Sequence, residues 1–84
     1  MKGKVLIVED EAEIRDLIKY NLESNGYTVI ALETGEKCLS TARSERPDLI
    51  LLDLMLPVLD GFDICRQLKE DSTTKLIPVV ILTA

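Results

Sequence analysis

The chain has 84 residues, of which 46% are hydrophobic and 30% are charged, and its formal net charge is -5. This length predicts one domain, and the composition is typical of a globular chain and excludes a disordered one. The net negative charge, without any basic patch in the sequence, argues against a nucleic-acid-binding surface. No stretch approaches the roughly 20 apolar residues of a membrane span, and none resembles an export signal, so we expect a cytoplasmic location.

Short apolar runs alternate with amphipathic stretches along the chain, which is the pattern of strands alternating with helices. The run DLILLD is apolar at both parities, as a strand covered on both faces would be. In chain order the predicted elements are a strand at 4–8, a helix at 11–25, a strand at 27–32, a helix at 34–46, a strand at 48–53, a helix at 60–71 and a strand at 77–84. This βαβαβαβ order predicts an α/β fold with a parallel sheet and right-handed crossovers.

The ends of the predicted helices carry local signals. Asp10 followed by Glu13 fits a capping pair at the start of the first helix, and Gly26 fits its stop. The pair Asp60-Gly61 supports a turn into the third helix. The apolar positions of the first helix follow helical spacing: Ile14, Leu17, Ile18 and Leu22.

The two cysteines, Cys38 and Cys65, fall on the apolar faces of the second and third predicted helices. Two cysteines without any histidine provide no zinc-binding constellation. We therefore expect both to be small core residues of a protein in a reducing compartment. The second helix is expected to turn Cys38, Leu39 and Ala42 inward and to end before Pro47.

Acidic residues follow two of the predicted strands. Glu9 and Asp10 end the first strand, and Asp53 ends the third. Each could be a cap or a solvated acid, but the carboxyl ends of parallel strands meet at one edge, where such sheets bind ligands. Two like charges at about 4 Å repel by about 4 kcal/mol at an effective dielectric constant of 20, so a cluster of this kind makes sense when a divalent cation sits in it. Oxygen ligands with open positions favour Mg²⁺.

A carboxylate beside Mg²⁺ can act as a nucleophile toward phosphorus, which makes Asp53 a candidate for an aspartyl phosphate. Thr83, at the end of the fourth strand, could donate its hydroxyl to a phosphoryl oxygen. Met55, two residues beyond Asp53, could offer its backbone carbonyl to the metal, and Pro57 fixes the chain as it leaves the strand.

Three segments, VLIVEDE, DLILLDLMLPVLDG and IPVVILTA, occur in the order and spacing of a bacterial response-regulator receiver domain, which the sequence resembles over all 84 residues. The resemblance implies a doubly wound, flavodoxin-like receiver fold, in which the four strands have the order 2-1-3-4. It also implies that Asp53 is the phosphoacceptor and that a sensor histidine kinase is the donor. The metal ligands would be Asp10, Asp53, the Met55 carbonyl and Glu9 through a water molecule, and Thr83 would be the switch hydroxyl, with the small Ala84 beside it.

The loop DLMLPVLDG resembles receivers of winged-helix transcription factors, whereas DGFDICRQLKEDSTT also resembles receivers attached to diguanylate cyclases, so both output domains stay open. A complete receiver continues with a fourth helix, a fifth strand and a fifth helix, which carry a phosphate-binding lysine and a switch aromatic residue. We therefore expect residues 1–84 to be the N-terminal part of a receiver, impaired in signalling.

With this strand order, the apolar fourth strand becomes an edge, and part of the sheet face beside the first helix is uncovered. Both features favour pairing with another chain. We therefore expect a homodimer or larger assembly through that strand and that face.

The sequence leaves three other functions to compare with this one. A Mg²⁺-dependent phosphohydrolase with an aspartyl-phosphate nucleophile would carry a second Asp where Met55 stands. A nucleotide-binding domain would have a glycine-rich loop after the first strand, where this chain has acids. A folding or assembly fragment without present activity is compatible with receiver ancestry.

Overall fold

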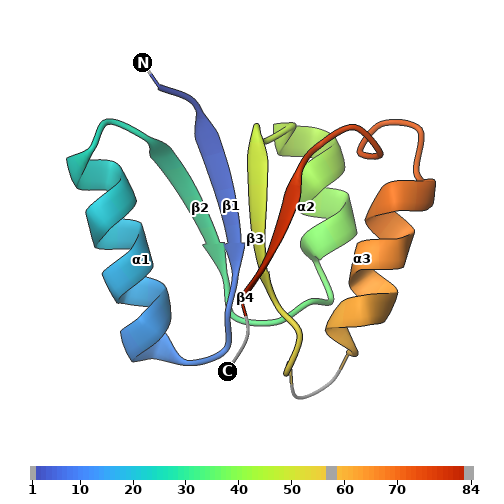
Figure 1. The fold of residues 1–84 in the computed structure, drawn as a ribbon, viewed down its shortest axis with the longest axis horizontal. Helices are drawn as coiled ribbons and strands as arrows, with labels where there is room; N and C mark the ends of the chain where they lie inside the picture. Colours follow the sequence, from blue (N-terminus) through green and yellow to red (C-terminus); the bar gives the residue numbers. More distant parts are fainter. Residues whose placement is uncertain (1, 57–58, 83–84) are drawn as a thin grey trace.

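The computed structural model describes residues 2–56 and 59–82 as one α/β unit (Figure 1). Its strands are β1 (Lys4–Val8), β2 (Thr28–Leu32), β3 (Leu49–Asp53) and β4 (Val79–Leu82). Its helices are α1 (Ala12–Ser24), α2 (Cys38–Glu45) and α3 (Gly61–Glu70). All seven predicted elements are therefore present, and none of the described helices is long and apolar enough to cross a membrane.

The four strands form one parallel sheet in the order β2-β1-β3-β4, which confirms the predicted topology. The register pairs Val8 with Leu52 and Asp53 with Leu82, so the carboxyl ends of the three strands β1, β3 and β4 lie at one edge. The residues that follow β1 and β3 in the sequence therefore begin at the same edge of the sheet.

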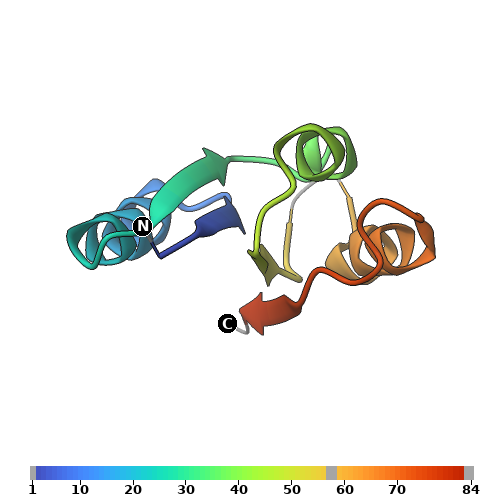
Figure 2. The same ribbon diagram turned by 90° about the horizontal axis from the view of Figure 1, so that it is seen from above.

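The helices lie in two layers, with α1 on one face of the sheet and α2 and α3 on the other (Figures 1 and 2). Between the sheet and the α2–α3 layer lies the main core, formed by Leu6, Val8, Cys38, Ala42, Ile50, Leu52, Ile64 and Leu68. Strand residues alternate between the two faces, so this core takes the even-numbered residues of β1 and β3, and Val79 and Ile81 of β4 pack against it. Cys38 is buried within it and Cys65 packs against it, as predicted for the two cysteines, and burial raises the pKa of the Cys38 thiol to about 11.

The opposite face is only partly covered. None of the residues of α1 is buried, and 62% of Leu17 and 47% of Val80 on β4 are exposed to solvent. The helical spacing of the apolar residues in α1 was predicted correctly, but their side chains cover only part of this face. The bare area beside α1 and β4 matches the expectation of an uncovered sheet face.

The predicted capping pair of α1 was wrong, although the helix begins within one residue of the predicted start. The N-cap residue is Glu11, and among the described residues no side chain caps this helix, so Asp10 and Glu13 do not form the expected capping pair. The Glu11 amide instead donates to the Glu9 carboxylate at 3.1 Å. Asp10 is thereby free to turn toward the strand end, and Gly26, with a φ of 93°, marks the predicted stop.

The predicted start of α2 at residue 34 was early, because the helix begins at Cys38. A Cβ atom on Gly35 would lie 2.1 Å from Cδ1 of Ile64, so this turn passes closely over α3 and its path is set by packing. The end of α2 follows the prediction: Arg46 adopts a left-handed conformation, with a φ of 47°, immediately before Pro47.

The polar connection after α3 is held by Asp71. Its carboxylate accepts hydrogen bonds from Arg43 of α2, at 2.7 Å from Nε, and from the Thr73 amide at 2.9 Å. The Arg43 guanidinium lowers the pKa of the Asp71 carboxyl, and the Thr73 amide lowers it further. This ion pair fixes the far end of α3 against α2. The strand that follows begins at Val79, two residues later than predicted.

Candidate functional site

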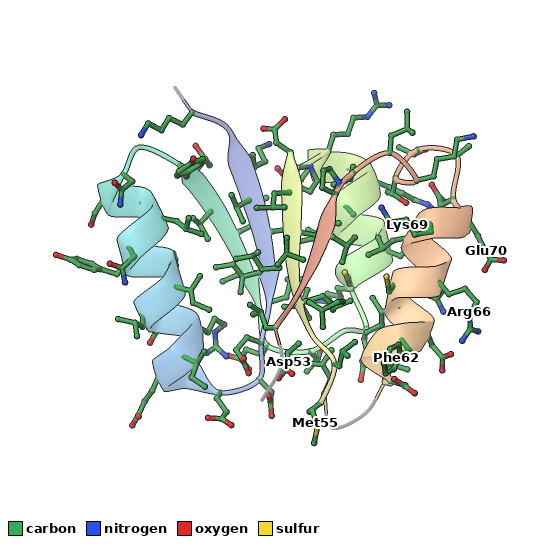
Figure 3. The ribbon with its side chains drawn as sticks, in the orientation of Figure 1. Asp53, Met55, Phe62, Arg66, Lys69 and Glu70 are labelled. Carbon is green, nitrogen blue, oxygen red and sulfur yellow. The ribbon has the colours of Figure 1, made fainter. Side chains whose placement is uncertain are left out.

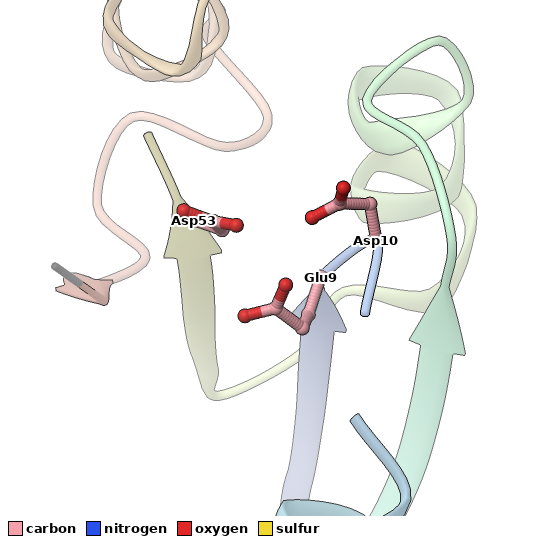
Figure 4. Close-up of side chains that lie close together, drawn as sticks. All are labelled: Glu9, Asp10 and Asp53. Carbon is pink, nitrogen blue, oxygen red and sulfur yellow. The ribbon is translucent and has the colours of Figure 1, made fainter. Parts of the chain in front are cut away.

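Three carboxylates meet at the carboxyl edge of the sheet (Figure 4). Glu9 and Asp10 follow β1, and Asp53 is the last residue of the neighbouring β3. One oxygen from each of the three lies within 4.8 Å of the others. The sequence prediction that Glu9, Asp10 and Asp53 converge is therefore confirmed, and the parallel pairing of β1 with β3 is the reason.

Asp53 is held in place by the loop that follows it. Its side chain is almost buried, since only 8% of the residue is exposed. The Met55 amide donates to Oδ1 at 2.9 Å, which leaves the second carboxylate oxygen for other partners. Leu82 lies opposite Asp53 in the sheet; Thr83, the predicted switch hydroxyl, lies outside the described residues, as do Ala84 and Pro57.

Glu9 is the most buried of the three acids, with 4% of the residue exposed. Burial raises the pKa of the Glu9 carboxyl to about 7. The amide of Glu11 opposes this rise, while the side chains of Asp10 and Asp53 increase it. The carboxyl therefore takes up a proton more readily than an ordinary glutamate, because burial penalises its charged form and the neighbouring carboxylates add to that penalty.

Arg15 is a basic residue beside the cluster that the sequence did not point to. Its Nη1 donates to the backbone carbonyls of Glu9 at 3.0 Å and Asp10 at 3.4 Å, and its Nη2 lies 3.6 Å from Glu33. Within residues 2–56 and 59–82, no ion pair joins a lysine or arginine to any of the three clustered carboxylates. Arg15 thus holds the backbone of the loop and does not neutralise the site. Its bonds go to main-chain atoms, so no residue pattern could have revealed them.

The donor set fits a hard divalent cation. Three carboxylate groups on two adjacent strand ends supply oxygen ligands only, and 4.8 Å is a span that one cation can bridge. A cation at this point would stabilise the ionised form of Glu9 and offset the repulsion that raises its pKa. The three carboxylates therefore fit a metal site, and Met55, two residues after Asp53, lies beside it through the bond from its amide to the Asp53 carboxylate.

A groove of about 300 Å³ runs from the acidic cluster along the α1 side of the sheet. Glu9, Glu11 and Asp53 line its polar end, and Ile14, Ile18, Ile81 and Leu82 line the rest. The nearly buried Asp53 is therefore reachable from this side.

Residues 5–84 match the response regulator receiver domain family. The chain belongs to this family. The receiver fold and the acidic cluster at its phosphoacceptor position thus agree with the resemblance found in the sequence, and a receiver domain implies a cognate histidine kinase.

Relatives with assigned names include the alkaline phosphatase synthesis transcriptional regulatory protein PhoP of Bacillus subtilis, which is 48% identical over 84 residues. That match covers 100% of this chain and 34% of PhoP, so the chain spans about a third of that relative's length. The master transcriptional regulator RpaA of Synechocystis is 47% identical over 96% of this chain and 34% of its own length. Both relatives are named as transcriptional regulators.

Solved receivers have the same fold as this one. The receiver protein domain from Methanoculleus marisnigri superimposes with a TM-score of 0.94 at 38% identity, covering 100% of this chain and 68% of that domain. The BeF₃-activated receiver domain of Klebsiella pneumoniae RstA gives a TM-score of 0.85 at 36% identity, covering 95% of this chain and 66% of its own.

Proposed function

We propose that this receiver accepts a phosphoryl group on Asp53 from the phosphohistidine of a sensor kinase, with Mg²⁺ bound by the acidic cluster. The observation that carries the proposal is the convergence of Glu9, Asp10 and Asp53 within 4.8 Å, at the edge where β1 and β3 end. Asp53 is the acid with a positioned oxygen, because the Met55 amide fixes its Oδ1 and leaves the other oxygen open.

In this reaction a carboxylate oxygen of Asp53 forms a bond to phosphorus while the bond from phosphorus to the donor's imidazole nitrogen breaks. The electron pair of the broken bond stays on that nitrogen, which can then take up a proton. The metal, when bound, neutralises charge on the phosphoryl oxygens. Asp10 and Asp53 would hold the metal directly and Glu9 through a water molecule, and the carbonyl of Met55 would be a further ligand. Thr83 is the hydroxyl that would bind the transferred group.

The chain is accordingly a phosphoacceptor, not an enzyme acting on a separate substrate, and any self-phosphorylation from small donors is expected to be slow. We infer a cytoplasmic location, which is typical of receiver domains. The exposed face beside α1 and the edge strand β4 favour association with a second copy. Impaired phosphotransfer by residues 1–84 stays a prediction, as does the choice between the two output domains.

Acetyl phosphate labelling tests the function directly. The chain is incubated with acetyl phosphate and Mg²⁺, and peptide mass spectrometry locates the added phosphoryl group. We expect labelling of Asp53 that requires Mg²⁺ and is lost in Asp53→Asn. A slow reaction would agree with impairment, whereas absence of any labelling would favour the reading as a folding or assembly fragment. Labelling at another carboxylate would contradict the assignment of Asp53.

A further inference from the structure

Arg15, on α1, is folded back onto the loop that carries Glu9 and Asp10. Its side chain is only 13% exposed. Its Nη1 donates to the backbone carbonyl of Glu9 at 3.0 Å and to that of Asp10 at 3.4 Å. An arginine at a protein surface usually extends its charged group into water. A guanidinium that is turned inward onto two successive carbonyls therefore restrains the loop between β1 and α1.

The main chain of Asp10 depends on this contact. β1 ends at Val8 and α1 begins at Ala12, so Asp10 belongs to neither element. Across residues 2–56 and 59–82, the bond from Arg15 is the only hydrogen bond to the Asp10 main chain. Asp10 is also exposed to solvent, so packing does not fix its side chain. The direction of the Asp10 carboxylate thus rests on Arg15.

The other two carboxylates of the cluster are held by the sheet. The Glu9 amide donates to the Leu32 carbonyl of β2 at 3.1 Å. Asp53 is paired with Leu82 between β3 and β4. Both acids are also nearly buried. Asp10 is therefore the member of the cluster whose position is most easily changed.

Arg15 also forms an ion pair, with Glu33 in the segment after β2. Its Nη2 lies 3.6 Å from Oε1 of Glu33, whose side chain is 76% exposed. Such a surface ion pair contributes only about 0–1 kcal/mol, because water screens it. The bonds to the two main-chain carbonyls are therefore the main contribution of Arg15.

We propose that Arg15 is a positioning residue of the metal site, which keeps the Asp10 carboxylate directed at Asp53 (Figure 4). The inference rests on the proposed function, because it concerns the same acidic cluster. Without Arg15, the loop gains conformations in which the Asp10 carboxylate is turned away from the other two acids. Mg²⁺ must then order this ligand as it binds, which lowers its affinity.

The charge of Arg15 acts in the opposite direction. A guanidinium beside a cation site repels the cation, so removal of the charge would by itself tighten Mg²⁺ binding. Loss of positioning weakens it. The sign of the change in affinity therefore separates a positioning role from an electrostatic one, and a role in folding alone leaves the affinity of the folded chain unchanged.

A Mg²⁺ titration followed by ¹⁵N–¹H correlation spectra tests the proposal, because these spectra report both weak binding and the fold of each variant. Arg15→Met removes the charge and the donors, whereas Arg15→Lys keeps the charge and one donor group. Glu33→Gln removes the ion pair alone. Arg66→Met is the matched control, since Arg66 is 63% exposed on the outer side of α3, away from Asp53 (Figure 3).

We expect Arg15→Met to raise the Kd for Mg²⁺ by about tenfold, as loss of a group that orients a metal ligand does. Arg15→Lys should recover part of the affinity, because its ammonium group can still donate to a carbonyl. Glu33→Gln and Arg66→Met should bind Mg²⁺ like wild type.

A second measurement uses the wild-type chain and so does not depend on how a variant folds. A bond that improves metal binding must itself be strengthened by the metal, because coupling between two sites is reciprocal. The guanidinium protons of Arg15 should therefore exchange with water more slowly at saturating Mg²⁺, whereas those of Arg66 should not change.

A Kd for Arg15→Met equal to or below that of wild type would overturn the proposal, as would Arg15 protons whose exchange does not respond to Mg²⁺. An equal weakening in Glu33→Gln would assign the effect to the ion pair and overturn it as well. Failure of the proposed function would look different, because the amides around Asp10 and Asp53 of wild type would then show no response to Mg²⁺.

Discussion

The amide of Gly61 donates a hydrogen bond to the carbonyl of Leu54, the residue that follows Asp53, at a distance of 3.3 Å. The first turn of α3 thus rests directly on the backbone that carries Asp53. A side chain at residue 61 would not fit, because a Cβ atom there would lie 2.5 Å from Cα of Leu54 and 2.8 Å from the carbonyl oxygen of Asp53. Glycine at this position is a condition for the geometry of the site.

Gly61→Ala should therefore destabilise the protein and disturb the site together. In an unhindered helix start, alanine would stabilise the helix by up to about 1 kcal/mol. Here the clash is with backbone atoms, so we expect a loss of about 1–3 kcal/mol in the free energy of unfolding, as for overpacking. Urea denaturation measures the loss, and Mg²⁺ titration should show weakened binding.

Gly35→Ala provides the matched control. Its Cβ would approach only side-chain atoms, 2.1 Å from Cδ1 of Ile64 and 3.2 Å from Cδ1 of Leu56. Because side chains can turn away, we expect a smaller loss of stability and unchanged Mg²⁺ binding. A Gly61→Ala variant as stable as wild type would contradict the close contact of α3 with Leu54.

Metal binding should depend on Asp10. Mg²⁺ that binds only the folded chain raises its stability, by about 1.4 kcal/mol at ten times the dissociation constant. We expect wild type to show such a rise in thermal unfolding, and Asp10→Ala to lose most of it, because one of the three clustered carboxylates is gone. Glu13→Ala is the control, since Glu13 is an acid of the first turn of α1 outside the cluster. Equal responses in the two variants would place the metal elsewhere.

The pKa of Glu9 predicts how stability depends on pH in the absence of metal. The carboxyl has a pKa of about 7 in the folded state against 4.5 ordinarily. The folded chain therefore holds this proton more tightly than the unfolded chain. The protonated Glu9 contributes its full share of the unfolding free energy below about pH 4.5, and this share is lost as the pH rises through about 7. The full loss would be of the order of 3 kcal/mol.

Glu9→Gln isolates this contribution, because the amide cannot ionise and its oxygen can still accept from Glu11. Without metal, the variant and wild type should have similar unfolding free energies near pH 4.5, and the variant should be the more stable one near pH 8. Mg²⁺ should narrow the difference at pH 8 by stabilising the ionised Glu9 of wild type. A difference that does not change with pH would show that burial does not raise the pKa of Glu9.

Local patterns allowed the alternation of strands and helices to be predicted, and the resemblance to receivers supplied the strand order 2-1-3-4 that places the acidic residues together. An apolar run ending in Asp53, and another ending in Glu9 and Asp10, are visible as letters, and parallel pairing places them together. The capping of α1 was not predictable in the same way. Asp10 is of a residue type that often caps helices, but the N-cap residue is Glu11, whose amide donates to the Glu9 carboxylate. That bond depends on where the sheet places the end of β1, which local sequence does not reveal.

The roles of Arg15 and Gly61 also required the structure. Arg15 acts through the backbone carbonyls of Glu9 and Asp10, and Gly61 acts through the lack of a side chain against Leu54. Neither interaction leaves a periodic or compositional pattern. The exposure of helix side chains also required the structure, since Leu17 has the spacing of a buried helix position and yet lies largely in solvent.

Association through the face beside α1 should depend on Val80. This residue is 47% exposed in the middle of β4, the edge strand of the described sheet, on the side where Leu17 is also exposed. A second copy that pairs with β4 would cover this apolar surface and satisfy the open edge.

We expect sedimentation to show a dimer or larger assembly at tens of micromolar. Val80→Lys should shift it to monomer, because a charge on an edge strand opposes pairing, whereas Leu76→Lys, an equally charged change at an exposed residue outside the strand, should leave the assembly intact. A folded wild-type monomer at these concentrations, or equal effects of the two lysines, would contradict association through β4.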